Sequence, residues 1–178
     1  MTDEAGVTVA GLSVNEGGKA VTYGGLVVGI VALDQITKLL AQRLLPPYEP
    51  VRVLGDFFRL TYIYNPGAAF GLHLGPASRY IFLTLTVVCV VVLIGWFRGT
   101  PSADRLRLLA ISLVTAGALG NFIDRLRSSR GVIDFFDFGI GAARWPVFNI
   151  ADIGVTVGAI LLAISLWRED RDATADGG

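Results

Sequence analysis

Four apolar segments of the chain are long enough to cross a membrane. A transmembrane helix needs about 20 apolar residues, because each residue advances the helix by about 1.5 Å through about 30 Å of hydrocarbon. Three of the segments contain no charged residue: 80–97, 108–123 and 153–167. The fourth, 21–45, is interrupted by Asp34, Lys38 and Arg43. We therefore predict membrane-spanning helices over about 21–45, 79–97, 107–125 and 148–167.

The segments outside these helices differ in character. Residues 46–77 open with a cluster of prolines that ends the first helix, since proline lacks a backbone N–H, and continue with β-branched and aromatic residues. Residues 126–147 form a second long connection. Residues 1–20 are polar and lack a basic region, which is typical of a tail rather than of a cleaved signal peptide. Residues 168–178 form a charged C-terminal tail.

The composition supports a membrane protein. Hydrophobic residues make up 53% of the 178 residues and charged residues 17%, whereas soluble domains carry about 25% charged residues. The 15 basic and 15 acidic residues cancel, so no net field attracts nucleic acid. The single cysteine, Cys89, and the single histidine, His73, exclude a disulfide framework, a multi-thiol metal site and a paired-histidine zinc motif. Carboxylates therefore remain the main candidates for catalysis.

Polar residues within the apolar segments gather toward one end of the predicted bundle. Helices that alternate in direction bring together the ends of the first and third helices and the starts of the second and fourth. Three polar pairs lie there, each spaced so that it shares one helical face: Asp34/Lys38, Asn121/Arg125 and Asn149/Asp152. A charge in a membrane span costs about 2.5–3.5 kcal/mol on insertion scales. Three such pairs indicate a functional site, and a purely structural Asp34–Lys38 ion pair is the alternative.

Two chemistries fit a cluster of carboxylates near one membrane face. Adjacent carboxylates share a proton, so one accepts a proton from water while the other donates one, which favours hydrolysis. The same groups also suit proton or cation relay, and charge alone does not separate these functions from each other or from a non-catalytic assembly role. The candidates are Asp34, Asp124, Asp134, Asp137 and Asp152. Basic residues are balanced between the two membrane sides, so the positive-inside rule leaves the orientation open.

Five short motifs follow one another along the chain. They are Asp34-Gln-Ile-Thr-Lys38, Asn65-Pro-Gly-Ala-Ala-Phe-Gly71, Gly117-Ala-Leu-Gly-Asn121-Phe-Ile-Asp-Arg125, Gly131-Val-Ile-Asp134-Phe and Phe148-Asn149-Ile-Ala-Asp152. Together and in this order they resemble the lipoprotein signal peptidase (signal peptidase II) family, which are bacterial aspartic membrane proteases. The resemblance covers about residues 24–167. Each motif alone is weak evidence, whereas five in order are specific.

The resemblance implies a fold and a location. The fold would be an all-α membrane protein, a four-transmembrane-helix bundle with a small β-structured extracytoplasmic cradle within 46–77 and a short interfacial helix. The protein would lie in the bacterial cytoplasmic (inner) membrane. Both termini would be cytoplasmic, and the active site would lie near the outer face.

The resemblance also assigns roles to the polar residues. Asp134 and Asp152 would be the catalytic dyad, one polarising the scissile carbonyl and the other activating water, with no metal and no cofactor. Six further residues would bind substrate or brace the site: Asp34, Lys38, Asn65, Asn121, Arg125 and Asn149. Asp124 and Asp137 would be structural carboxylates.

The implied substrates are diacylglyceryl-modified prolipoproteins, cleaved just before the lipidated lipobox cysteine. The other expected partners are membrane lipid and the cyclic-peptide antibiotics that inhibit the family. We expect a monomer that binds no nucleic acid.

Overall fold

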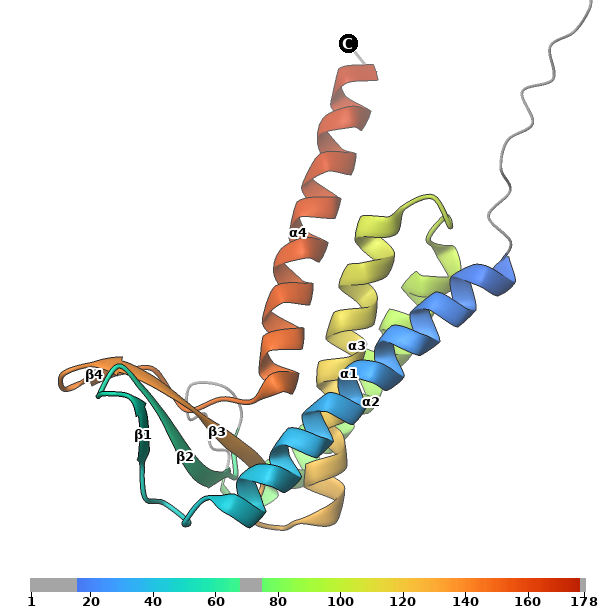
Figure 1. The fold of residues 1–178 in the computed structure, drawn as a ribbon. Coiled ribbons are helices and arrows are strands. Elements are labelled where there is room, and N and C mark those ends of the chain that lie inside the picture. Colours follow the sequence, from blue (N-terminus) through green and yellow to red (C-terminus); the bar gives the residue numbers. More distant parts are fainter. Residues whose placement is uncertain (1–15, 68–74, 177–178) are drawn as a thin grey trace, which may run out of the picture.

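The computed structural model describes residues 16–67 and 75–176 and contains four long helices (Figure 1). They are α1 (Glu16–Leu44), α2 (Ser78–Gly99), α3 (Arg105–Arg127) and α4 (Ile150–Asp176). Each is long and apolar enough to cross a membrane, which confirms the four predicted spans. Two helices extend into the segments expected as tails, α1 by starting at Glu16 and α4 by continuing to Asp176. Neither extension contains proline, so the helical hydrogen bonds continue past the apolar stretch.

Glycines allow α3 and α4 to pack closely. A Cβ atom at Gly117 would collide with the backbone oxygen of Ala151, and one at Gly158 would lie 2.7 Å from the side chain of Val114. Gly154 and Gly158 have the four-residue spacing of small residues that is typical of tightly packed membrane helices. The contact places the end of α3 beside the first turn of α4.

A small antiparallel sheet joins two segments that are far apart in the sequence. Its strands are β1 (Val51–Leu54), β2 (Phe58–Asn65), β3 (Val132–Ile140) and β4 (Ala143–Arg144), in that spatial order. The expected β-structured segment within 46–77 supplies only β1 and β2, and the connection 126–147 supplies the rest. β3 was not predicted because it carries apolar residues on both faces and lacks clear alternation. The protein is therefore mostly helical rather than all-α.

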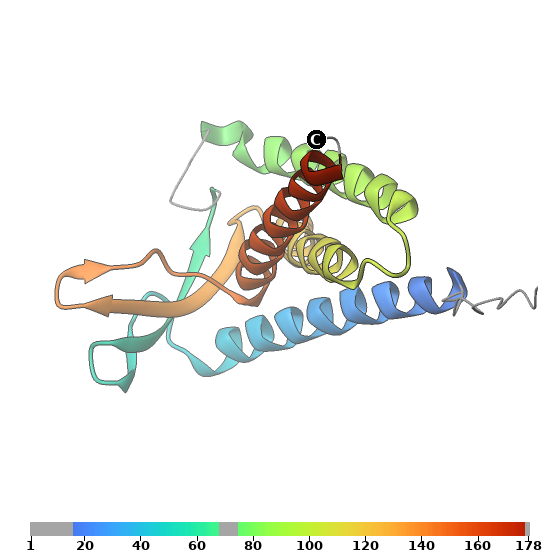
Figure 2. The ribbon, with the colours of Figure 1, turned by 90° about the horizontal axis from the view of Figure 1, so that it is seen from above.

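The sheet lies at one end of the bundle, where α1 and α3 end and α2 and α4 begin (Figures 1 and 2). Figure 2 shows α3 between α1 and α2. On one face of β3, Ile133 and Phe135 pack against Ala41 of α1 and Tyr62 of β2. Because successive strand residues point to opposite faces, Asp134 points away from α1.

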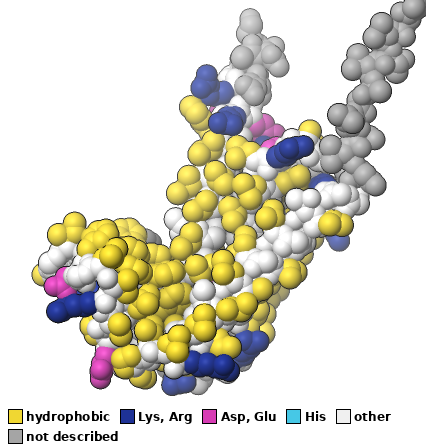
Figure 3. Space-filling model, viewed as in Figure 1, with side chains coloured by type: hydrophobic (Ala, Val, Ile, Leu, Met, Phe, Trp, Pro, Cys, Tyr) yellow, Lys and Arg dark blue, Asp and Glu magenta, His cyan; other side chains and the backbone are white. Residues whose placement is uncertain are grey.

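The surface of the helices is apolar, as Figure 3 shows for one side of the molecule. Large hydrophobic residues are exposed on every helix, among them Val28, Val88, Leu109 and Ile160. In a membrane, acyl chains cover such a surface. In water, the apolar side chains would contact solvent, which costs free energy. In the region of the expected interfacial helix, the described residues form a three-residue 3₁₀ helix, η2 (Gly75–Ala77). Residues 68–74 lie outside the described part of the chain, so the interfacial helix stays a prediction.

Candidate active site

Asp134 is a buried carboxylate on β3, with 1% of the residue exposed. Each of its oxygens accepts a hydrogen bond from an asparagine amide. Nδ2 of Asn65 on β2 lies 3.0 Å from Oδ2, and Nδ2 of Asn149 lies 2.7 Å from Oδ1. Within the described part of the chain, no lysine or arginine forms an ion pair with Asp134. Neutral amides therefore satisfy this carboxylate without balancing a charge.

Asp152 lies in the first turn of α4, where two reciprocal hydrogen bonds hold it. The backbone N–H of Asn149 donates to Oδ2 of Asp152 at 3.1 Å, and the backbone N–H of Asp152 donates to Oδ1 of Asn149 at 2.9 Å. This arrangement is a capping box, which satisfies free N–H groups at a helix start. The remaining oxygen, Oδ1, accepts from Nδ2 of Asn121 on α3 at 2.8 Å. The position and orientation of Asp152 follow from the way that α4 begins.

The segment before α4 hydrogen-bonds to β3 and brings the two aspartates together. The backbone N–H of Phe136 donates to the oxygen of Phe148 at 2.8 Å, and that of Phe148 donates to the oxygen of Phe136 at 3.1 Å. The next residue, Asn149, is fully buried. It contacts Asp134 through its side chain and Asp152 through its backbone. One asparagine therefore bridges both carboxylates.

This environment changes the acid–base chemistry of Asp134. The pKa of Asp134 is raised from 3.8 to about 7, mainly by burial and also by the negative charge of Asp152. Hydrogen bonds from Asn65 and Asn149 and the charge of Lys38 act in the opposite direction. Asp134 therefore releases its proton near neutral pH rather than near pH 4, which suits an acid beside a second carboxylate.

A second group of buried carboxylates surrounds Lys38. The ammonium of Lys38 lies 2.9 Å from Oδ2 of Asp34 and 2.8 Å from Oδ2 of Asp124, and all three residues are at most 5% exposed. It also donates to Oδ1 of Asn121 at 3.0 Å. Asp34 in turn accepts from the backbone N–H of Ala151 in α4 at 2.9 Å. The Asp34–Lys38 ion pair that was the structural alternative is present, and Asn121 links it to Asp152.

Gln35 belongs to this second group, although the sequence analysis did not select it. Its Nε2 donates to Asp34 and to Asp124, both at 3.1 Å, and its Oε1 accepts from Arg127 at 2.7 Å. Residues three or four apart share one helical face, and Gln35, the immediate neighbour of Asp34, lies off that face. Its place within the first of the five motifs was the available signal.

Arg125 braces the chain rather than an aspartate. It is 8% exposed, donates to the backbone oxygen of Gly67 at 2.9 Å, and lies 5.2 Å from the ring centre of Phe82. Arg79, at the start of the predicted second span, donates to the backbone oxygens of Arg125 and Leu126 at 2.7 and 3.0 Å. These arginines tie the start of α2, the end of α3 and the segment after Asn65 to one another.

Asp137 is also on β3 but belongs to a separate ion-pair network. It accepts from Arg144 at 2.6 Å, Arg59 at 3.1 Å and Thr61 at 2.7 Å. Burial alone raises the pKa of Asp137, but the hydrogen bonds from Thr61 and Arg144 and the charge of Arg59 outweigh it and hold the pKa below its ordinary value. This carboxylate is paired with cations and does not share the site of Asp134.

Side-chain contacts join seven of the eight residues that the resemblance selected: Asp34, Lys38, Asn65, Asn121, Asn149, Asp134 and Asp152. The eighth, Arg125, donates to the backbone oxygen of Asn121 at 3.4 Å. Residues 68–71 of the Asn65 motif, and His73, lie outside the described part. In that described part, no group of three or more histidines, cysteines or carboxylates is arranged to hold a metal ion.

The fold and the site define a class: a four-span membrane protein in which a strand and a helix start bring two carboxylates together. The family model for signal peptidase (SPase) II matches residues 26–168. The chain therefore belongs to the signal peptidase II family, which confirms the resemblance seen in the motifs. It is a peptidase of the bacterial inner membrane.

Curated relatives and a solved structure agree with this assignment. The chain is 40% identical to the lipoprotein signal peptidase of Halothermothrix orenii, over 82% of this chain and 95% of that protein. It is 40% identical to the lipoprotein signal peptidase of Burkholderia mallei, over 91% and 97% of the two chains. A bacterial membrane enzyme solved by the in meso method at 2.3 Å resolution is similar with a TM-score of 0.76 and 33% identity, over 85% of this chain and 90% of that one. Membership in this family supports a role in the processing of bacterial lipoproteins.

Proposed function

We propose that the protein removes the signal peptide from diacylglyceryl-modified prolipoproteins, and that Asp134 and Asp152 are its catalytic dyad. The scissile bond is the one just before the lipidated lipobox cysteine. The observation that carries the proposal is the carboxylate pair bridged by Asn149 and free of direct ion pairs among the described residues. In a chain of the signal peptidase II family, a pair that holds one proton suits hydrolysis by activated water.

The two aspartates have different roles in the proposed reaction. Asp134 carries the proton at rest, because it is the more deeply buried of the two and its pKa is raised to about 7. Asp152, held as a carboxylate acceptor at the start of α4, is the base. It takes a proton from water as the water oxygen attacks the scissile carbonyl carbon, while Asp134 gives its proton to the carbonyl oxygen.

The resulting tetrahedral intermediate collapses with the same two groups in reversed roles. Asp152 gives the proton that it took from water to the leaving nitrogen, and the carbon–nitrogen bond breaks. Asp134 takes back a proton from a hydroxyl of the intermediate as the new carboxyl group forms. The net change is the addition of one water molecule across the peptide bond, and the dyad returns to its starting state.

The surrounding polar residues position the dyad in this proposal. Asn65, Asn121 and Asn149 donate to the carboxylates and leave their protons available for the reaction. Lys38 acts through Asn121, to which it donates, and it pairs with Asp34. Asp34 ties α1 to the start of α4 by accepting from the backbone N–H of Ala151. Arg125 holds the backbone at Gly67 and so the segment that follows Asn65, where the substrate backbone would lie.

We further propose that the sheet lies at the outer face of the membrane and that both tails, 1–20 and 168–178, are cytoplasmic. The start of α1 and the end of α4 are at the same end of the bundle, opposite the sheet (Figure 1), which supports a common side for both termini. The sheet and an interfacial helix before α2 would then form a cradle over the lipobox. Cyclic peptides that place a hydroxyl between the two aspartates are the expected inhibitors, and the active form is a monomer.

The deciding experiment is cleavage of a synthetic diacylated lipobox peptide by the purified protein in detergent. We expect cleavage just before the lipidated cysteine, with no membrane potential or ion gradient present. An identical peptide without the diacylglyceryl group is the matched control and should be cleaved far more slowly. A gradient-dependent ion flux in liposomes without cleavage would instead establish the relay function. Cleavage at another bond would overturn the proposed specificity.

A further inference from the structure

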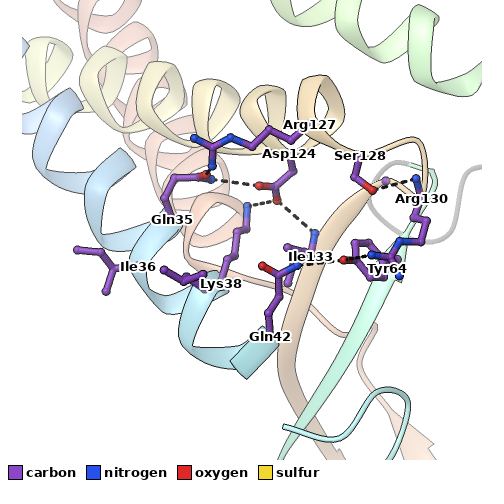
Figure 4. Close-up of a pocket in the computed structure, with 12 residues that line it drawn as sticks. Gln35, Ile36, Lys38, Gln42, Tyr64, Asp124, Arg127, Ser128, Arg130 and Ile133 are labelled. Atoms are coloured by element: carbon purple, nitrogen blue, oxygen red, sulfur yellow. Dashed lines mark hydrogen bonds and ion pairs between the residues drawn. The ribbon is translucent and has the colours of Figure 1, made fainter. Parts of the chain in front are cut away.

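A cavity lies on the opposite side of β3 from Asp134. It has a volume of about 470 Å³ and opens between α1, the end of α3 and the sheet (Figure 4). Ile133 lines it, whereas the next residue, Asp134, does not, because successive strand residues point to opposite faces. Asp152 is also absent from its lining. The cavity is therefore separate from the proposed catalytic dyad.

Two exposed arginines line this cavity and have no acidic partner among the described residues. Arg127 donates to Oε1 of Gln35 at 2.7 Å, and Arg130 donates to the hydroxyl of Tyr64 at 2.6 Å. The guanidinium of Arg130 also lies 3.9 Å from the ring centre of Tyr64. Both contacts hold the guanidinium groups in place but leave their charge unbalanced. Figure 4 shows the two side chains reaching the cavity from the end of α3 and from the turn after it.

The one carboxylate in the lining does not cancel these charges. Asp124 is 5% exposed and is already held by Lys38 at 2.8 Å, by Nε2 of Gln35 at 3.1 Å and by the backbone N–H of Ile133 at 3.2 Å. Its oxygens are therefore occupied by donors inside the protein. The opening of the cavity presents positive charge to whatever enters it.

The wall formed by α1 includes two apolar side chains that face outward, beside the polar residues Gln35, Lys38 and Gln42. Ile36 and Leu39 line the cavity and are 56% and 44% exposed. They are three residues apart and share one face of a helix that spans the membrane. A ligand in this cavity would therefore meet acyl-chain surroundings on one side and two guanidinium groups at the membrane boundary on the other.

We propose that this cavity binds the headgroup of an anionic membrane phospholipid. Arg127 and Arg130 contact the phosphodiester oxygens, since guanidinium groups donate paired hydrogen bonds to phosphate. The acyl chains run along Ile36 and Leu39. Three neutral side chains at the same end can donate to the hydroxyls of a glycerol headgroup: Gln42, Tyr64 and Ser128. The proposal does not depend on the cleavage reaction.

Lipid retention measured by native mass spectrometry tests the proposal. The intact protein is released from micelles that contain equal amounts of dioleoyl phosphatidylglycerol and dioleoyl phosphatidylcholine. Both lipids carry a phosphodiester, but the choline cation cancels its charge. We expect the wild type to retain the glycerol lipid about tenfold more than the choline lipid, because attraction to a net negative charge is worth about threefold for each of two exposed arginines.

Variants distinguish this cavity from general surface charge. In R127Q/R130Q the preference should fall to near equality. Arg130→Gln alone, which removes one exposed guanidinium charge, should lower the lipid preference about threefold. This single variant tests the proposal if the double variant does not fold. Arg43→Gln is the matched control, because Arg43 is an exposed arginine in the last turn of α1 that does not line the cavity. An equal loss in Arg43→Gln, or an unchanged preference in both cavity variants, would overturn the proposal.

A soluble competitor separates a lipid site from a simple phosphate site. Glycerol phosphate, added at the same concentration as the lipid, should leave the bound phosphatidylglycerol in place, because it lacks the acyl chains that contact α1. Leu39→Gln should weaken retention of both lipids without changing their ratio. Displacement of the lipid by equimolar glycerol phosphate would show that the cavity binds free phosphate, and the lipid assignment would be wrong.

Discussion

The protein contains two pairs of aspartates, three of them buried and Asp152 partly buried, that are neighbours and yet have different surroundings. Asp34 and Asp124 share the ammonium of Lys38, at 2.9 and 2.8 Å. Asp134 and Asp152 share only the neutral residue Asn149. Asn121 contacts both pairs, since it accepts from Lys38 and donates to Asp152. Burial of a carboxylate therefore does not by itself indicate catalysis, and the absence of a direct cation is what distinguishes the pair that we propose to be reactive.

The largest expected effect comes from removing the proton chemistry of the reactive pair. In Asp134→Asn and Asp152→Asn, cleavage of the diacylated peptide should fall by on the order of 10³-fold or more, because each residue is an acid or a base in the proposed mechanism. Both proteins should still insert into the membrane. Asp170→Asn is the control, since Asp170 is an exposed aspartate on the same helix as Asp152. Full processing by either dyad variant would show that the dyad assignment is wrong.

The second effect concerns the cation that distinguishes the two pairs. Lys38→Met keeps the length of the side chain but leaves Asp34 and Asp124 buried without their cation, which should destabilise the protein by about 3–5 kcal/mol. Cleavage should decrease by up to about 10²-fold, because a small displacement of Asn121 misplaces Asp152. Thermal unfolding and peptide cleavage measure the two effects.

A double variant shows whether the effect of Lys38→Met arises from uncompensated charge. Lys38→Met combined with Asp124→Asn removes one of the two carboxylates along with the cation. It should therefore be more stable than Lys38→Met alone. If the double variant loses as much stability as Lys38→Met and Asp124→Asn lose together, the contact between Lys38 and Asp124 does not stabilise the protein through charge.

The third effect is the pH dependence of the reactive pair. Because burial and the charge of Asp152 raise the pKa of Asp134 to about 7, its carboxyl is protonated below that pH and can act as the acid. We expect kcat/KM to fall about tenfold per unit as the pH rises above about 7. A rate that stays constant from pH 6 to 9 would exclude Asp134 as the acid.

The same pKa predicts a change in stability. The unfolded chain releases this proton near pH 4 and the folded protein near pH 7, so the stability contributed by protonated Asp134 is present below about pH 4 and is lost as the pH rises to about 7. Asp134→Asn has no such proton. Its unfolding temperature should therefore rise relative to wild type between pH 5 and pH 8, whereas that of Asp170→Asn should follow the wild type.

Features that depend on residues close together along the chain could be predicted from the sequence. Continuous apolar stretches predicted the four spans, and alternation of helix direction predicted that Asp34, Asn121 and Asp152 lie at the same end. β3 could not be predicted, because its pairing with β2 and with Phe148 joins residues that are far apart along the chain. The extension of α4 to Asp176 was also missed, since hydropathy identifies the apolar part of a helix and not its end.

The division of the aspartates into two pairs needed tertiary contacts. Spacing alone paired Lys38 with Asp34, and the contact is present at 2.9 Å. It could not show that Lys38 also binds Asp124, which lies on another helix. Composition left five candidate aspartates equivalent, and only the resemblance selected Asp134 and Asp152. The bridging position of Asn149 explains physically why these two differ from the rest.

The smallest expected effect on activity tests the same rule on a fifth aspartate. Asp137 is paired with Arg144 and Arg59 and should behave like the structural pair. Asp137→Asn should lower stability at pH 7 by about 1–3 kcal/mol, because two cations lose a buried partner, while cleavage stays within about threefold of wild type. Since the pKa of Asp137 is lowered, this stability is present above about pH 4 and lost as the pH falls further.

The control for Asp137 is Asp56→Asn. Asp56 is 59% exposed and pairs with Arg52 at the surface, so the change should cost at most about 1 kcal/mol. Thermal unfolding at pH 7 and peptide cleavage distinguish the two variants. A loss of cleavage in Asp137→Asn as large as in Asp134→Asn would mean that direct ion pairing does not separate structural from reactive carboxylates in this protein. Retained cleavage with reduced stability would show that direct ion pairing marks a structural carboxylate in the sheet, as it does for Asp34 and Asp124 on the helices.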